Sequence, residues 1–202
     1  ENAGPYARII ELSDGWNVAP IILSLDGSSS SNSLLLTVNN TSGNSSLSAP
    51  GVVTLGTWMH VAVTYQTTEY KSSWFSWGST AVRGTATIYV NGQLAKSGPV
   101  LAPAFAIRRT SYLGKSTASW DPLFKGRMAE VRLWNLCRSA DQIRRNKNRR
   151  LTGSESGLIA YYRLNERDGE RAGDASRYQR HGFLRGSAGW IQTAPLPSVS
   201  RD

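Results

Sequence analysis

Residues 57–65 of this chain have the sequence TWMHVAVTY, and residues 87–92 have the sequence TIYVNG. The first segment places apolar side chains at both odd and even positions, which predicts a strand buried on both faces inside a sandwich. The second combines strong strand formers with Asn91-Gly92, the strongest short hairpin-turn dipeptide. We therefore expect residues 93–97 to return as the neighbouring strand, so that a β-hairpin lies at the centre of the fold.

Together these segments resemble the centre of the laminin-G-like, concanavalin A-like lectin-glucanase family, in which a W-x-H-V-A-V-T-Y strand leads to a Y-V-N-G hairpin. Three more segments are similar to pieces of that family in the same order, namely an early strand and turn, a late strand and the trailing segment, at residues 8–15, 124–135 and 151–162. The resemblance implies an all-β jelly-roll β-sandwich of two antiparallel sheets. It does not imply one function, because one fold hosts many functions.

The remaining elements follow from local patterns. Ser139 and Gln142 form a capping-box pattern, which predicts one short helix over about 139–147. Residues 39–46, rich in Ser and Asn, predict a loop. A chain of 202 residues fits one domain, which we predict over 1–194, with a tail or linker at 195–202.

The resembled family normally has one or two strands before the segment matched by residues 8–15. They are missing here, either because the chain was cut from a larger protein or because another segment fills the gap. Residues 158–164 alternate Leu158, Ala160, Tyr162 and Leu164 with Ile159, Tyr161 and Arg163. This alternation predicts a replacement strand that pairs at the sheet edge left open near the N-terminus, where an uncovered edge would invite association between chains.

The formal net charge is +9, and it is uneven along the chain. Residues 138–202 carry 13 Lys and Arg against 7 Asp and Glu, whereas residues 1–137 carry 10 against 7. A basic surface favours anionic partners such as acidic polysaccharide, lipid headgroups or nucleic acid. No nucleic-acid motif is present, so we expect no specific nucleic-acid binding.

The densest basic run lies just after the predicted helix and contains Arg144, Arg145, Lys147, Arg149 and Arg150. Such a run is usually a solvated face that the negative end of the helix dipole favours. The alternative is that these five side chains bind sulfated or carboxylated glycans or phosphates, which makes them the candidate polyanion-binding residues.

Residues 66–85 form an unusually long connection for a hairpin, and they carry Tyr70, Trp74, Phe75 and Trp77. Aromatic rings stack on the apolar C–H faces of sugars, so we predict that Trp74 or Trp77 is exposed and contacts a glycan or a protein partner. The alternative is that these rings pack under the loop as a small satellite core. Trp120, in a Trp-Asp-Pro loop, completes the predicted ligand-binding set.

Calcium is the one candidate cofactor, and the resemblance alone implies it. The family often holds the ion with an Asp beside the Glu of the late strand and with an Asp-x-Ser turn. Here the turn begins at Asp174, Glu130 follows an Ala where the family has Asp, and Asp121 matches another family pattern. These three carboxylates are the candidate ligands. In the alternative, Asp174 and Asp121 only fix turns through hydrogen bonds to their own backbone.

Residues 166–170, ERDGE, have the carboxylate spacing of the Glu-x-Asp-x-Glu strand of laminarinase-type enzymes. In those enzymes the residues between the carboxylates are apolar because they face the core. Here Arg and Gly occupy these positions among turn formers, which predicts a solvated loop. The chain also lacks a Gly-x-Ser-x-Gly elbow and a phosphate-binding loop, so we predict that it is not an enzyme.

These observations predict a non-catalytic extracellular recognition module, secreted or at the cell surface, within a larger protein. It would bind a glycan or cell-surface polysaccharide, or mediate adhesion. A structural or assembly module that makes protein–protein contacts or self-associates is the alternative, and a glycoside hydrolase is the least favoured. No apolar run is long enough to span a bilayer, so we expect no transmembrane segment.

Overall fold

The computed structural model of the chain describes residues 4–15, 19–26, 32–40, 42–69 and 83–191. The contacts within the chain divide it into two compact units, unit 1 (Glu1–Gly126) and unit 2 (Arg127–Asp202). Each unit is described by itself.

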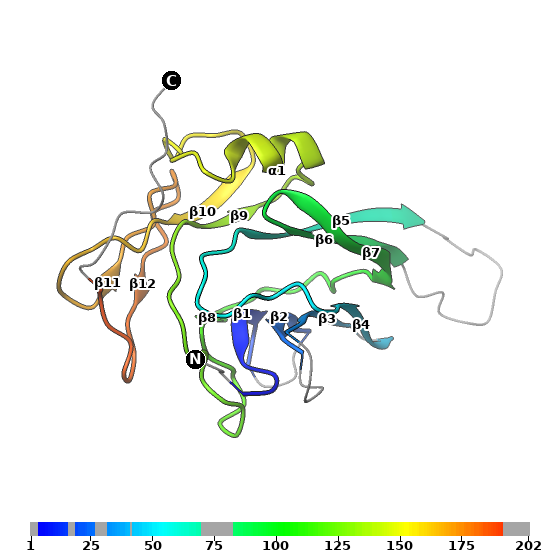
Figure 1. Cartoon of the computed structure of the whole chain (residues 1–202), viewed down its shortest axis with the longest axis horizontal. Coiled ribbons are helices and arrows are strands. Elements are labelled where there is room, and N and C mark those ends of the chain that lie inside the picture. The colour runs from blue at the N-terminus through cyan, green and yellow to red at the C-terminus, as the bar shows by residue number, and fades with distance from the viewer. Residues whose placement is uncertain (1–3, 16–18, 27–31, 41, 70–82, 192–202) are drawn as a thin grey trace. The chain divides into compact units, whose positions relative to one another are not determined.

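Unit 1 contains two antiparallel sheets that face each other (Figure 1). The first has the order β4-β3-β2-β1-β8, and its strands are β1 (Arg8–Ser13), β2 (Ile21–Leu25), β3 (Leu34–Asn40), β4 (Gly43–Ala49) and β8 (Thr110–Leu113). The second has the order β5-β6-β7, with β5 (Val61–Glu69), β6 (Arg83–Val90) and β7 (Gln93–Leu101). This arrangement confirms the predicted jelly-roll β-sandwich.

One apolar core fills the space between these sheets. Alternate residues of β3, Leu34, Leu36 and Val38, are buried in it. They pack in one cluster with Ile88 of β6 and Val100 of β7. Because side chains along a strand alternate between faces, each strand gives one row to this core and turns the other row away from it. The removal of these rows from water drives the packing of the two sheets.

The hairpin at residues 87–97 forms as predicted. Asn91 and Gly92 both have positive φ angles, 53° and 81°, as a type I′ turn requires. Asn91 also exchanges hydrogen bonds with His60, because its backbone N–H donates to the His60 carbonyl at 2.7 Å and its side-chain oxygen accepts from the His60 N–H at 3.0 Å. This exchange holds the start of β5 against the turn.

The prediction of a doubly buried strand at residues 57–65 is wrong. The strand begins at Val61, residues 61–65 are only half-buried, and Trp58 is 47% exposed. The physical reason is position, since β5 lies at the edge of its sheet and β6 takes the centre. The predicted connection at 66–85 is also shorter than expected, because β5 continues to Glu69 and β6 starts at Arg83.

The prediction of a loop at residues 39–46 is also wrong. Asn39 and Asn40 pair with Asn44 and Gly43 across the β3–β4 hairpin. The polar side chains of β4 lie at exposed or half-buried positions, whereas Leu47 is buried in the core. A few apolar residues thus suffice for this strand because the ladder hydrogen bonds involve only the backbone.

The described part of unit 2 combines short strands with one helix. Two antiparallel pairs are present, β9 (Val131–Trp134) with β10 (Leu158–Tyr162), and β11 (Arg171–Ala172) with β12 (Gly182–Phe183). Helix α1 (Ala140–Asn146) has the predicted capping box, in which the Ser139 side chain accepts from the Gln142 N–H and the Gln142 side chain accepts from the Ser139 N–H. No helix in the described ranges is long and apolar enough to cross a membrane.

Residues 158–162 form the predicted strand, but its predicted partner is wrong. β10 pairs with β9, and the expected N-terminal edge does not exist because β1 already pairs with β2 on one side and β8 on the other. The late strand is also shorter than residues 124–135 and covers only Val131–Trp134. One domain over 1–194 stays a prediction, and the expected tail at 195–202 lies outside the described residues.

Candidate functional site

A buried carboxylate in unit 1 anchors the loop at residues 115–123, which follows β8. The side chain of Glu11, on β1, belongs to a residue that is only 2% exposed. It accepts hydrogen bonds from the Ser116 hydroxyl at 3.1 Å, and from the Thr117 N–H at 3.3 Å and the Thr117 hydroxyl at 2.5 Å. A buried carboxylate without such donors would be strongly destabilising, so loop and strand depend on each other.

An ion pair fixes the same loop at a second point. Arg8 donates to the Asp121 carboxylate at 2.9 Å, and the two side chains are only 16% and 14% exposed. Arg8 also lies 3.6 Å from the Glu11 carboxylate, so one guanidinium joins both anchoring carboxylates. We call residues 115–123 the Glu11-anchored loop.

The Glu11-anchored loop presents Trp120, which is 72% exposed. Keeping an apolar ring in water costs about 25 cal/mol for each Å². An exposed aromatic side chain on a loop fixed by buried polar contacts therefore indicates a contact surface. Trp120 is the one predicted ligand-binding residue within the described ranges, because Tyr70, Trp74, Phe75 and Trp77 lie outside them.

The predicted calcium ligands have other partners. Asp121 pairs with Arg8 in unit 1. Asp174, in unit 2, accepts four hydrogen bonds, from the backbone N–H groups of Tyr161, Ser176 and Arg180 and from the Ser176 hydroxyl. Burial by itself raises the pKa of the Asp174 carboxyl, but these hydrogen bonds together lower that pKa below its ordinary value of 3.8.

Glu130 accepts from the Tyr161 hydroxyl at 2.5 Å and from Arg132 at 2.8 Å. Burial first, and then the hydrogen bond and charge of Glu130, raise the pKa of the Tyr161 hydroxyl. Since Tyr161 meets Asp174 through its backbone N–H and Glu130 through its hydroxyl, the two carboxylates lie at opposite ends of one residue.

Calcium prefers six to eight oxygen ligands. The Asp174 oxygens are already occupied by protein donors, and in the described ranges no three His, Cys, Asp or Glu side chains form a group able to hold a metal. Asp174 therefore does not fit a calcium ion as the structure has it, and the structure favours the alternative that Asp174 fixes a turn. Calcium binding by Asp121 or Glu130 stays a prediction.

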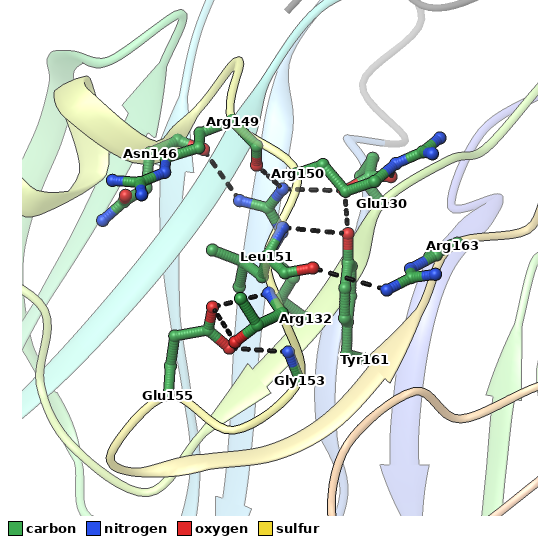
Figure 2. A network of polar contacts seen from close by, with 11 residues as sticks. Glu130, Arg132, Asn146, Arg149, Arg150, Leu151, Gly153, Glu155, Tyr161 and Arg163 are labelled. Carbon is green, nitrogen blue, oxygen red and sulfur yellow. Dashed lines mark hydrogen bonds and ion pairs between the residues drawn. The ribbon is translucent and has the colours of Figure 1, made fainter. Parts of the chain in front are cut away.

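The predicted basic run surrounds the C-terminal end of α1. Figure 2 shows Arg132 between the carbonyl oxygens of Asn146 and Arg149 and the Glu130 carboxylate. Arg132 thus satisfies carbonyl groups at and beyond the helix end, where no intrahelical donor is available. This contact fixes the segment that carries the run.

Two of the five cations in the run have acidic neighbours. Arg144 pairs with Asp141, and the Arg150 Nε lies 3.9 Å from a Glu130 oxygen. Arg145, Lys147 and Arg149 make no ion pair with any acidic residue that the structure describes. These three side chains are the part of the run that is available to an external anion.

Local sequence patterns do not indicate an open surface depression of about 300 Å³ in unit 2. Trp190 contributes to its wall, and the indole N–H of this residue donates to the Gly169 carbonyl at 2.7 Å. The other lining residues are Gly169, Glu170, Leu184, Arg185, Gly186, Ala188 and Gly189.

Residues 166–170 form no strand, as predicted. Glu166 accepts from the Gly173 N–H at 2.7 Å, whereas Asp168 and Glu170 are exposed. The alternation that would aim three carboxylates at one substrate, as in laminarinase-type enzymes, is therefore missing from this segment.

Comparison with protein families matches residues 2–144 to the laminin-G-like family described as the concanavalin A-like lectin/glucanases superfamily. The match covers all of the described part of unit 1 and extends through β9 into α1. The chain belongs to this superfamily. No curated protein sequence matches the chain.

Two solved structures are similar to the chain. One is a "putative carbohydrate binding protein" from Bacteroides ovatus, with a TM-score of 0.53 and 22% identity over 85% of this chain and 46% of that one. The other is an S-layer domain-containing protein from Clostridium thermocellum, with a TM-score of 0.33 and 18% identity over 73% of this chain and 65% of that one. The chain thus spans about half the length of the Bacteroides protein, and the first similarity supports the fold.

Proposed function

We propose that this member of the concanavalin A-like lectin/glucanase superfamily is a non-catalytic module that recognises glycans at the cell surface or in the extracellular space. The observation that carries the proposal is Trp120, 72% exposed on the Glu11-anchored loop. The indole offers a flat apolar face, which matches the C–H face of a sugar ring.

The anchoring of the loop supports the proposal in a second way. A binding loop that is already ordered loses little conformational freedom when a ligand binds, so more of the contact energy appears as affinity. Glu11, Arg8 and Asp121 supply that order through hydrogen bonds and an ion pair within and around the loop.

The superfamily includes both lectins and glucanases, so membership alone does not separate binding from catalysis. Two observations favour binding. The carboxylates of residues 166–170 lie on a loop and not on a strand. The similar structure from Bacteroides ovatus carries the name of a carbohydrate binding protein.

The basic run favours an acidic glycan. Arg145, Lys147 and Arg149 make no ion pair with a described acidic residue, so their charges are available to carboxylate or sulfate groups. Exposed charges are screened over about 8 Å at physiological salt, so this contribution should weaken as salt rises.

The experiment is a binding screen of the purified protein on an array of neutral and acidic glycans. Trp120→Ala should abolish the binding that the wild type shows, and Trp120→Phe should keep part of it because a ring remains. Phe183→Ala is the matched control, since Phe183 is an exposed aromatic outside the Glu11-anchored loop. All three variants should melt close to the wild-type temperature, because the replaced side chains are largely in water.

Failure of the wild type to bind any glycan on the array would overturn the proposal. Binding that survives Trp120→Ala unchanged would assign recognition to another surface.

An assembly module is the second candidate, and one surface favours it. Phe105 is fully exposed and Ile107 is 67% exposed, and both lie on the loop before β8. Arg108 fixes this loop by donating to the carbonyls of Ala104 at 3.0 Å and Ala19 at 3.2 Å. Two apolar side chains on a fixed loop suit a protein contact. Sedimentation analysis over a range of concentrations tests this candidate. The candidate requires that the wild type self-associates and that the double variant Phe105→Ser with Ile107→Ser does not.

A further inference from the structure

The turn after β11, at residues 174–181, is fixed from within. The Asp174 carboxylate accepts from the backbone N–H groups of Ser176 at 2.8 Å and Arg180 at 2.9 Å. The Ser176 hydroxyl oxygen accepts from the Tyr178 N–H at 3.3 Å. Gln179 takes a φ of 51°, in the left-handed region that tight turns use. The turn thus holds its outer residues in place without help from a ligand.

Two arginines of this turn lie over one tyrosine ring. The guanidinium carbons of Arg177 and Arg180 are 5.0 Å and 4.7 Å from the centre of the Tyr178 ring, and Arg177 also donates to the Tyr178 hydroxyl at 3.0 Å. Tyr178 remains 38% exposed. We call Arg177, Tyr178 and Arg180 the Arg–Tyr–Arg cluster.

The charge of this cluster is not balanced by an ion pair. Neither Arg177 nor Arg180 forms a salt bridge with an acidic residue in the described part of the chain. The carboxylate that their turn contains, Asp174, is buried and accepts its four hydrogen bonds from three backbone N–H groups and the Ser176 hydroxyl, and none from a guanidinium. A ring face attracts a guanidinium but does not neutralise it. Two like charges therefore remain close together at the surface.

We propose that the Arg–Tyr–Arg cluster is a binding site for the carboxylate or sulfate groups of an acidic polysaccharide. This inference rests on the proposed glycan recognition and names the class of glycan. A guanidinium offers parallel N–H donors that match the oxygens of a carboxylate or sulfate group. Two guanidiniums next to one ring place two such pairs of donors close together. Tyr178 adds an apolar surface for the sugar ring that carries the anion.

The two sources of the anion, uronic acids and sulfate esters, are separated by the probes. Binding would be measured by biolayer interferometry with polygalacturonate, which is carboxylated, dextran sulfate, which is sulfated, and unmodified dextran as the neutral polymer. We expect the wild type to bind at least one of the charged polymers, to ignore dextran, and to bind more weakly as salt rises.

The decisive variant is Arg177→Gln with Arg180→Gln, and its matched control is Arg167→Gln with Arg171→Gln. Both pairs remove the same charge from exposed positions of unit 2. The cluster variant should lose affinity by about ten-fold or more, because hydrogen bonds to charged groups are lost. The control pair should lose less than about three-fold, since it removes only long-range attraction.

A charge-preserving variant separates geometry from net charge. Arg177→Lys with Arg180→Lys keeps both cations but removes the planar forks, so we expect about a three-fold to ten-fold loss of affinity. The melting temperature should stay within about 1 °C of the wild type in each variant, because all of these side chains are at the surface.

Equal losses in the cluster variant and its control would overturn the inference, as would a wild type that binds neither charged polymer. Competition by double-stranded DNA as effective as that by dextran sulfate would show a general anion site instead. If Trp120 is needed for neutral glycans while acidic polymers are ignored, the inference fails and the proposed function stands. If acidic polymers need the cluster and no glycan needs Trp120, the proposed role of Trp120 fails and the cluster site stands.

Discussion

The two units of this chain are stabilised by different means. In unit 1, two sheets share one apolar core, in which Ile88 and Val100 are completely buried. In the described part of unit 2, the buried apolar cluster is small and consists of Leu151, Leu158 and Tyr161, with Trp134 and Ala175 packed against it. A pair of short strands is marginally stable by itself, so unit 2 depends on polar contacts centred on Asp174, Glu130 and Arg132.

The contrast between the two units follows from the length of their strands. Where strands are long enough to build wide sheets, burial of apolar area stabilises the fold without regard to pH. Where strands are short, buried backbone N–H groups need hydrogen-bond acceptors outside the strand ladder. A carboxylate such as Asp174 can accept hydrogen bonds from several of these N–H groups at once. Unit 2 should therefore respond to single polar substitutions and, through Asp174, to pH.

The largest effect is expected in the core of unit 1. Ile88→Ala removes a fully buried side chain from the central strand β6 and leaves a cavity, which should lower the free energy of unfolding by about 2–5 kcal/mol. Urea denaturation followed by fluorescence measures this loss. Leu94→Ala, in the same hairpin at 64% exposure, is the control and should change stability by less than about 0.5 kcal/mol. Similar losses in both variants would contradict the description of the core.

The next effect concerns backbone packing in unit 2. A Cβ at Gly153, which has a φ of +102°, would lie 1.9 Å from the Ala175 carbonyl oxygen. The left-handed backbone alone should cost Gly153→Ala about 1–3 kcal/mol, and the steric contact adds to that loss. Gly186→Ala is the matched control, because Gly186 also has a positive φ but no atom within 4 Å of the added Cβ. Equal melting temperatures for the two variants would show that the Ala175 backbone moves away freely.

The pH dependence of unit 2 should follow Asp174. Because its pKa is below 3.8 in the folded chain, its ionised form stabilises the fold above about pH 4. This contribution is lost as the pH falls from 3.8 through the lower folded-state pKa. Asp174→Asn cannot accept all four hydrogen bonds, so we expect a loss of about 1–3 kcal/mol at pH 7 and a flatter profile below pH 4. Thermal unfolding between pH 2 and pH 7 tests both, and a variant as acid-sensitive as the wild type would refute the assignment.

The smallest effect is expected at the start of α1. Ser139→Ala removes the side chain that accepts from the Gln142 N–H at 3.2 Å, and should cost about 1 kcal/mol. Ser139→Asp keeps an acceptor at this position and should restore most of the stability. Differential scanning calorimetry resolves this difference, and no difference between the Ala and Asp variants would show that the cap does not contribute.

Local sequence patterns predicted the structure correctly where the interactions that form it join residues close together in the sequence. Asn91-Gly92 predicted its turn because both residues tolerate positive φ, and Ser139 with Gln142 predicted the helix start because the capping box closes within four residues. Local patterns failed at residues 39–46, where the backbone ladder between β3 and β4 prevails over a composition typical of loops.

The candidate sites show the same division. The sequence by itself determined the hairpin, the helix cap and the excess of basic residues in the C-terminal part. It also indicated Trp120 and the basic run as side chains that could bind a glycan. Only the tertiary structure decided that Trp120 is exposed on a fixed loop, because Glu11 and Ser116 are 105 residues apart and Arg8 and Asp121 are 113 apart. It also decided that β10 pairs with β9 and that Asp174 is occupied by backbone donors. Hydrogen bonds and burial between distant segments depend on chain topology, which local periodicity does not encode.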